Sequence, residues 1–139
     1  MKRYLALALC AFAAMLASAV AGTAVADTWP ARPVKVVVGF APGGPTDLFA
    51  RLIAQKLSQQ TGSNFYIENV PGAGGNVGAG RVAQSAPDGY TLLVTGGNLT
   101  NNPFLFSHIP YNLTDFDGVT LGAATPVVLT VNPRCRPIV

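Results

Sequence analysis

The stretch from Val34 to Asp47 reads Val-Lys-Val-Val-Val-Gly-Phe-Ala-Pro-Gly-Gly-Pro-Thr-Asp, and it decides the fold class. The run up to Phe40 is apolar and β-branched almost without interruption, which is typical of a strand buried on both faces of a parallel sheet. The Gly/Pro turn from Ala41 to Asp47 ends this strand. A helix is predicted directly after it, over Leu48–Gln60. A strand, a glycine-rich turn and a helix in this order predict a βα unit.

The predicted helix has an apolar face and recognisable ends. Apolar residues recur four positions apart, and polar residues take the opposite face. The expected apolar face consists of Leu48, Phe49, Leu52, Ile53 and Leu57. Thr46 or Asp47 is expected to cap the helix N-terminus, and Gly62 stands just past its C-terminus. Asp47 is also interpreted as a polar contact to a ligand, and the sequence leaves both interpretations open.

The same alternation continues along the chain. Further strands are expected at 65–68 and 90–94, a second glycine-rich turn at 70–75, a second helix at 76–85 and a turn at 86–89. A polar loop at 98–103, a short turn at 104–106 and two strand-like runs at 119–123 and 127–131 follow. Strands that alternate with helices predict an α/β fold with a mainly parallel sheet.

The N-terminus has the three-part composition of a secretory signal. Lys2 and Arg3 precede the uncharged stretch 5–20, and Ala24-Val25-Ala26 supplies the small-residue cleavage pattern. A membrane anchor is the alternative, but the apolar core softens at 21–23 and no basic cluster follows it. We therefore expect residues 1–26 to be a cleaved signal peptide, the mature chain to begin at Asp27, and the protein to be exported.

Composition excludes several functional classes. The chain of 139 residues is 50% hydrophobic and 11% charged, with a formal charge of +3. Without the signal, 113 residues remain with 7 Lys or Arg and 6 Asp or Glu, so no basic surface suggests a nucleic-acid partner. Cys135 then has no second cysteine, and His108 has no neighbouring ligand type, so no metal site is expected. Because no nucleophile elbow or acid–base pair is recognisable, we expect a non-enzyme without a cofactor.

Two glycine-rich turns precede the first two predicted helices. Gly43 and Gly44 lie in one turn, and Gly72, Gly74 and Gly75 lie in the other. In a parallel sheet these turns share the carboxyl edge, where the ligands of open α/β folds bind. Helix N-terminal amides that glycine leaves accessible favour a small anion such as a carboxylate. The glycines are equally explained as residues that permit tight turns with positive φ, so both interpretations stay open.

A dinucleotide site is the enzymatic alternative. The segment from Gly72 to Gly78 fits a loose Gly-x-Gly-x-x-x-Gly pattern between a strand and a helix. The preceding strand is polar and Pro71 enters the turn, and both features weaken the match. A secreted Rossmann-like oxidoreductase remains the alternative to a binding protein.

Four motifs resemble one known family. They are Phe40-Ala-Pro-Gly-Gly-Pro-Thr-Asp-Leu-Phe-Ala-Arg51, Glu68-Asn-Val-Pro-Gly-Ala-Gly-Gly-Asn-Val-Gly78, Ala86-Pro-Asp-Gly-Tyr-Thr-Leu92 and Asn102-Pro-Phe-Leu-Phe106. In order and spacing, from about Trp29 to Pro133, they are similar to the substrate-binding proteins of tripartite tricarboxylate transporters, the Bug receptor family. The resemblance implies a type II periplasmic binding protein fold. Its two α/β lobes capture a small carboxylate and deliver it to a membrane permease.

The resemblance also implies a ligand site in the first lobe. In that family the first two βα loops hold the carboxylate of the ligand, and the loop after the third strand is the next candidate. Carried over, the implied ligand-binding residues are Pro42, Gly43, Gly44, Thr46, Asp47, Gly72, Ala73, Gly74, Gly75, Asn76, Gly97 and Asn98.

Length is the one departure from the family. We expect the sequence to stop where the family's chain crosses into its second lobe, and residues 134–139 look unlike the family. We therefore expect residues 27–133 to be an incomplete first lobe of low stability, followed by an atypical tail. Two interpretations follow: part of a solute-binding protein, or a non-functional remnant of a broken reading frame.

Overall fold

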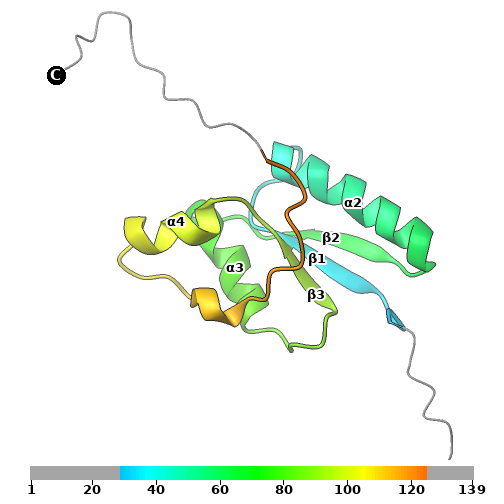
Figure 1. The fold of residues 1–139 in the computed structure, drawn as a ribbon. Helices are drawn as coiled ribbons and strands as arrows, with labels where there is room; N and C mark the ends of the chain where they lie inside the picture. Colours follow the sequence, from blue (N-terminus) through cyan, green and yellow to red (C-terminus); the bar gives the residue numbers. More distant parts are fainter. Residues whose placement is uncertain (1–28, 125–139) are drawn as a thin grey trace, which may run out of the picture.

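A computed structural model describes residues 29–124, which contain a three-stranded parallel sheet (Figure 1). The strands are β1 (Val34–Val38), β2 (Phe65–Asn69) and β3 (Thr91–Val94), in the spatial order β2-β1-β3. β1 pairs in parallel with both neighbours, with Val36 opposite Ile67 on one side and Leu92 on the other. The predicted α/β class with a parallel sheet is therefore confirmed.

Helices cover both faces of this sheet. The α-helices are α2 (Pro45–Thr61), α3 (Asn76–Ala83) and α4 (Asn98–Leu105), and the short 3-10 turns are η1 (Ala73–Gly75) and η2 (Leu113–Asp115). α2 packs on β1 and β2, whereas α3 packs on β3 and β1 from the other side and contacts α4 (Figure 1). Within residues 29–124, no helix has both the length and the apolar character needed to cross a membrane.

The core lies between β1 and α2. Val34, Val36 and Val38 are buried and pack with Ala50 and Ala54 of α2. The intervening Val37 points to the opposite face of the sheet, and it is also fully buried. Burial on both faces explains why the sequence of β1 is an apolar run instead of an alternating pattern.

The ends of α2 differ in part from the prediction. The helix begins at Pro45, three residues earlier than expected, because proline is well suited to the first helical position. Gly44 is the N-cap residue, and no side chain of the described residues caps this end, so the predicted capping by Thr46 or Asp47 is wrong. The predicted stop at Gly62 is confirmed: Gly62 has a φ of 72° and donates its N–H to the Ser58 carbonyl at 3.0 Å.

The buried face of α2 also differs from the prediction. Leu48 and Leu52 are 60% and 65% exposed, while Asp47, Ala50 and Ala54 are buried. The buried positions follow helical spacing, but they carry small side chains and one carboxylate. Small alanine side chains allow close packing of the helix on the sheet, and Leu57 is the leucine of the expected apolar face that packs partly buried against this core.

The structure confirms some of the predicted elements after α2 and contradicts others. β2, α3 and β3 lie within two residues of the expected ranges, so these three elements are confirmed. The expected polar loop at 98–103 and the turn at 104–106 are wrong, because Asn98–Leu105 forms α4 with Pro103 inside it. The run 119–123 is not a strand, and its Val119 and Leu121 are more than 80% exposed. The signal peptide and the run 127–131 lie outside the described residues.

Candidate functional site

The loop between β1 and α2 surrounds an open hollow at the carboxyl edge of the sheet. Phe40, Ala41, Pro42, Gly43, Gly44, Pro45 and Thr46 line this hollow of about 640 Å³. Four of the predicted site residues are therefore brought together here. Gly43 has a φ of 85°, a conformation that side-chain-bearing residues rarely adopt, so this glycine permits the turn.

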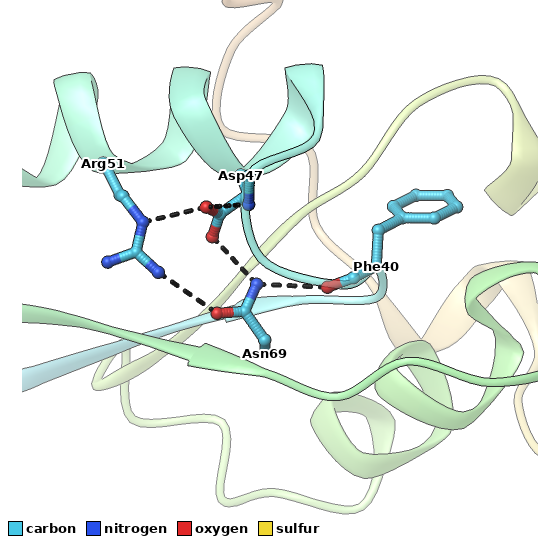
Figure 2. Close-up of polar contacts among 5 residues, drawn as sticks. Phe40, Asp47, Arg51 and Asn69 are labelled. Carbon is cyan, nitrogen blue, oxygen red and sulfur yellow. Dashed lines mark hydrogen bonds and ion pairs between the residues drawn. The ribbon is translucent and has the colours of Figure 1, made fainter.

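Asp47 stands in the first turn of α2 and is joined by hydrogen bonds to Arg51, to Asn69 and to the loop before the helix (Figure 2). Only 1% exposed, it accepts hydrogen bonds at Oδ2 from the Gly43 N–H at 2.9 Å and from Arg51 Nε at 2.8 Å. Its Oδ1 accepts a hydrogen bond from Asn69 Nδ2 at 2.8 Å. Asn69 Nδ2 also donates to the Phe40 carbonyl at 3.1 Å. One carboxylate thus ties the start of α2 to the loop and to the end of β2.

The same contacts keep Asp47 ionised. The hydrogen bond from Arg51 is the largest influence, followed by those from Gly43 and Asn69, and together they hold the pKa of Asp47 well below its usual value. The pKa of Arg51 is raised by the same pairing. The negative charge of Asp47 is therefore paired with Arg51. A free negative charge next to the hollow would repel an anionic ligand, and the pairing reduces this repulsion.

The loop between β2 and α3 has an unusual backbone. Gly72, Ala73, Gly74 and Gly75 all have positive φ, and the Gly75 N–H donates to the Gly72 carbonyl at 2.9 Å. Three of these residues are glycine, which adopts this conformation at no steric cost. The turn interpretation of these glycines is therefore confirmed, and it leaves the ligand interpretation untested.

The first two loops meet at a close approach of backbone to backbone. A Cβ atom placed on Gly39 would lie 3.0 Å from both Cα and O of Gly75. A Cβ atom on Gly78 would lie 2.9 Å from Gly39 Cα and 3.0 Å from the Val70 carbonyl oxygen. Glycine at these positions lets the end of β1 lie directly against the start of α3. The close approach brings the two loops side by side.

The start of α4 connects the third loop to the second. Asn98 Nδ2 donates to the Gly74 carbonyl at 3.1 Å, and Asn102 Nδ2 donates to the same oxygen at 3.0 Å. Asn102 is buried, and it also contacts Asn76 Oδ1 at 2.6 Å. Tyr111 completes this cluster with its hydroxyl, 3.3 Å from Asn76 Oδ1, and burial raises the pKa of Tyr111.

The predicted site residues fall into three groups by burial. Pro42, Gly43, Gly72, Ala73, Gly74 and Gly97 are exposed on the three loops, and Gly44, Thr46 and Asn98 are partly exposed. Asp47, Gly75 and Asn76 are buried. The carboxylate of Asp47 is occupied by the Gly43, Arg51 and Asn69 contacts, so Asp47 holds the loop in place, and its interpretation as a ligand contact stays a prediction.

Sequence reasoning missed four residues that hold the loops: Arg51, Asn69, Asn102 and Tyr111. Arg51 had a usable signal, because it stands four residues after Asp47 and such pairs face each other on a helix. Asn69 had a weaker signal as the last residue of a strand. Asn102 and Tyr111 had none, because their contacts depend on how α4 folds back onto the second loop.

A family model and two curated relatives are similar to this chain over most of its length. The family model described as tripartite tricarboxylate transporter family receptor matches residues 49–138. Protein BugT of Bordetella pertussis is 40% identical over 120 residues, which are 84% of this chain and 37% of that protein. A Pseudomonas protein from the tcbD-tcbE intergenic region is 38% identical over 111 residues, 79% of this chain and 33% of the relative. The chain thus spans about a third of the length of these curated relatives.

Solved structures agree with this comparison. The structure titled "R. palustris Rpa4515 with adipate" has a TM-score of 0.60 at 39% identity, over 62% of this chain and 29% of that one. A structure described as a periplasmic transporter has a TM-score of 0.54 at 40% identity, over 60% of this chain and 29% of that one. The described α/β fold therefore matches part of the fold of these periplasmic proteins.

Proposed function

The chain belongs to the family of tripartite tricarboxylate transporter receptors, and from this premise we propose that its loops hold a carboxylate group of a small ligand. The family consists of transporter receptors and not of enzymes, in agreement with the non-enzymatic class that the sequence predicts. The secreted oxidoreductase is therefore set aside as an alternative.

The juxtaposition of the two glycine loops is the observation that carries this proposal. Both loops lie at the carboxyl edge of the parallel sheet, and each leads into the N-terminus of a helix. At the start of α2 the first helical turn has amides without an intrahelical partner, and the helix dipole is positive there. At the start of α3, by contrast, the Gly75, Asn76 and Val77 N–H groups already donate to the Gly72 and Ala73 carbonyls. Pro45 has no N–H, and the Leu48 N–H already donates to the Gly44 carbonyl at 3.0 Å, so the partly exposed Thr46 offers the backbone donor beside the hollow, and Gly44 brings no side chain over it.

The charge around the hollow fits an anionic ligand. Its lining carries no carboxylate, and the buried Asp47 is paired with Arg51 at 2.8 Å. The related R. palustris structure is named with adipate, a dicarboxylate. We therefore propose a small carboxylate as the ligand, with Pro42, Gly43, Gly44 and Thr46 on one side and Gly72, Ala73 and Gly74 on the other. Gly97 and Asn98 border the second group.

Adipate titration followed by amide NMR tests the proposal. We expect adipate to shift the amide signals of loops 40–46 and 72–76, and neutral adipamide to leave them unchanged. Gly44→Val should weaken adipate binding at least tenfold, since loss of one charged hydrogen bond costs about 1.5–3 kcal/mol. A Cβ at Gly44 comes no closer than 3.7 Å to the nearest neighbouring atom, so this variant should fold.

Gly118→Val is the matched control, because a Cβ there meets nothing within 4 Å among the described residues. It should leave the adipate response unchanged. Equal shifts with adipamide, or an unchanged response in Gly44→Val, would refute the two-loop site. No response at any loop amide would instead favour the interpretation as a non-functional remnant.

We also propose that the chain is exported to the periplasm and delivers its ligand to a membrane permease. The signal-like residues 1–26 and the periplasmic relative support this proposal. Expression in a Gram-negative host should release a product that begins at Asp27, measured by intact-mass spectrometry of the periplasmic fraction. An intact Met1 in the membrane fraction would contradict the cleavage and the location.

A further inference from the structure

The Gly74 carbonyl is held by two side chains from one helix. Asn98 Nδ2 and Asn102 Nδ2 donate to this oxygen at 3.1 and 3.0 Å. The two asparagines are four residues apart and therefore share a face of α4. Each asparagine must present its side-chain Nδ2, and not its Oδ1, to the Gly74 oxygen, because a carbonyl oxygen can only accept a hydrogen bond. α4 thus presents two donors to a single acceptor in the second loop.

The peptide unit between Gly74 and Gly75 would otherwise be free to rotate. Its carbonyl belongs to Gly74, and its N–H donates to the Gly72 carbonyl at 2.9 Å. Rotation of this unit changes ψ of Gly74 and φ of Gly75, and glycine tolerates either orientation on both sides. The hydrogen bonds at the two ends of the peptide, together with the close packing of Gly75 against Gly39, therefore select the observed orientation.

Each asparagine is itself held in place. Asn98 Oδ1 accepts hydrogen bonds from the Gly96 N–H and from Thr95 Oγ1, both at 3.1 Å, which fixes its Nδ2 toward the second loop. Asn102 is 4% exposed, and its Nδ2 lies 2.6 Å from Asn76 Oδ1. Donors that are held in advance lose little entropy when they bind the carbonyl.

We propose that Asn98 and Asn102 are positioning residues that lock the Gly74–Gly75 peptide in the orientation required for carboxylate binding. This inference rests on the proposed function of the second loop. The lock also joins the third loop, through Asn98, to the backbone that faces the ligand. The ligand site therefore depends on α4 even where α4 contributes no direct contact.

The experiment compares Asn98→Ala, Asn102→Ala and the double variant with Asn101→Ala. Asn101 is an exposed residue of the same helix, which makes it the matched control. NMR relaxation dispersion at the Gly74 and Gly75 amides, without ligand, should show exchange in the first three variants only. Adipate affinity should fall roughly fivefold for each single variant and more than tenfold for the double variant, since one neutral hydrogen bond contributes about 1 kcal/mol.

The two measurements separate this inference from the proposed function. If adipate shifts the parent loops but Asn98→Ala shows no exchange at Gly74 and Gly75, the lock is refuted and the carboxylate site survives. If exchange appears while adipate affinity stays unchanged, the lock has no role in binding and the inference also fails. If adipate shifts no loop amide signal of the parent protein, the proposed function is refuted, and the inference that rests on it is refuted as well. Asn98 is only partly buried, so its variant tests the lock even where Asn102→Ala unfolds.

Discussion

Asp47→Ala is expected to lower the melting temperature by roughly 10 °C or more. The substitution removes the acceptor of three hydrogen bonds, from the Gly43 N–H, Arg51 and Asn69. The part-buried Gly43 N–H then loses its side-chain acceptor, and Asn69 Nδ2 keeps only its bond to the Phe40 carbonyl; a donor left unsatisfied costs more than the bond itself contributed. Thermal unfolding followed by far-UV circular dichroism measures this effect.

Asp117→Ala is the matched control, because Asp117 is an exposed residue of the same type. It should change the melting temperature by no more than about 2 °C. Equal melting temperatures for Asp47→Ala and Asp117→Ala would show that Asp47 does not anchor the loop.

Acid titration isolates the charge of Asp47. Because folding depresses its pKa below the ordinary value of 3.8, Asp47 contributes its full stabilisation above about pH 4. That contribution is lost as the pH falls from about 4 toward the lower pKa of the folded state. Asp47→Asn should therefore flatten the decline of melting temperature below about pH 4. Glu68, whose pKa is lowered chiefly by Lys35, should account for a remaining slope.

Gly78→Val is expected to destabilise the fold by about 3 kcal/mol. Its Cβ would lie 2.9 Å from Gly39 Cα and 3.0 Å from the Val70 carbonyl oxygen, and both neighbours are backbone atoms that cannot rotate away. The start of α3 would have to move away from the end of β1, which separates the two loops of the proposed site. Urea unfolding of the variant and the parent measures the difference.

A second glycine and a control sharpen this prediction. Gly39→Ala places a Cβ 3.0 Å from Gly75 Cα and should destabilise the same crossing, whereas Gly118→Val should leave stability unchanged. A Gly78→Val variant as stable as Gly118→Val would show that the crossing tolerates a side chain.

The sequence by itself determined the elements whose signal is local. The apolar run of β1 predicted a strand buried on both faces, and Gly62 predicted the end of α2. Glycines at 43, 44, 72, 74 and 75 predicted tight turns with positive φ at the carboxyl edge of the sheet. The structure confirms this for all of them except Gly44, which has a φ of −77°. Such features follow from side-chain size, periodicity and backbone freedom within a few residues, so they can be predicted without a fold.

Only the tertiary structure decided which faces and side chains meet. The leucines of α2 favoured one buried face, but close approach to the sheet selected Ala50 and Ala54 and left Leu48 exposed. The segment 98–105 is polar and contains Pro103, yet it forms helix α4. Two asparagines of this helix donate hydrogen bonds to the Gly74 carbonyl. Asp47 reads as a cap in the sequence, whereas contact with Asn69 makes it a loop anchor. The contacts of Asp47 with Asn69 and of the α4 asparagines with Gly74 join residues 22 to 28 positions apart in the chain, and no local pattern encodes such distances.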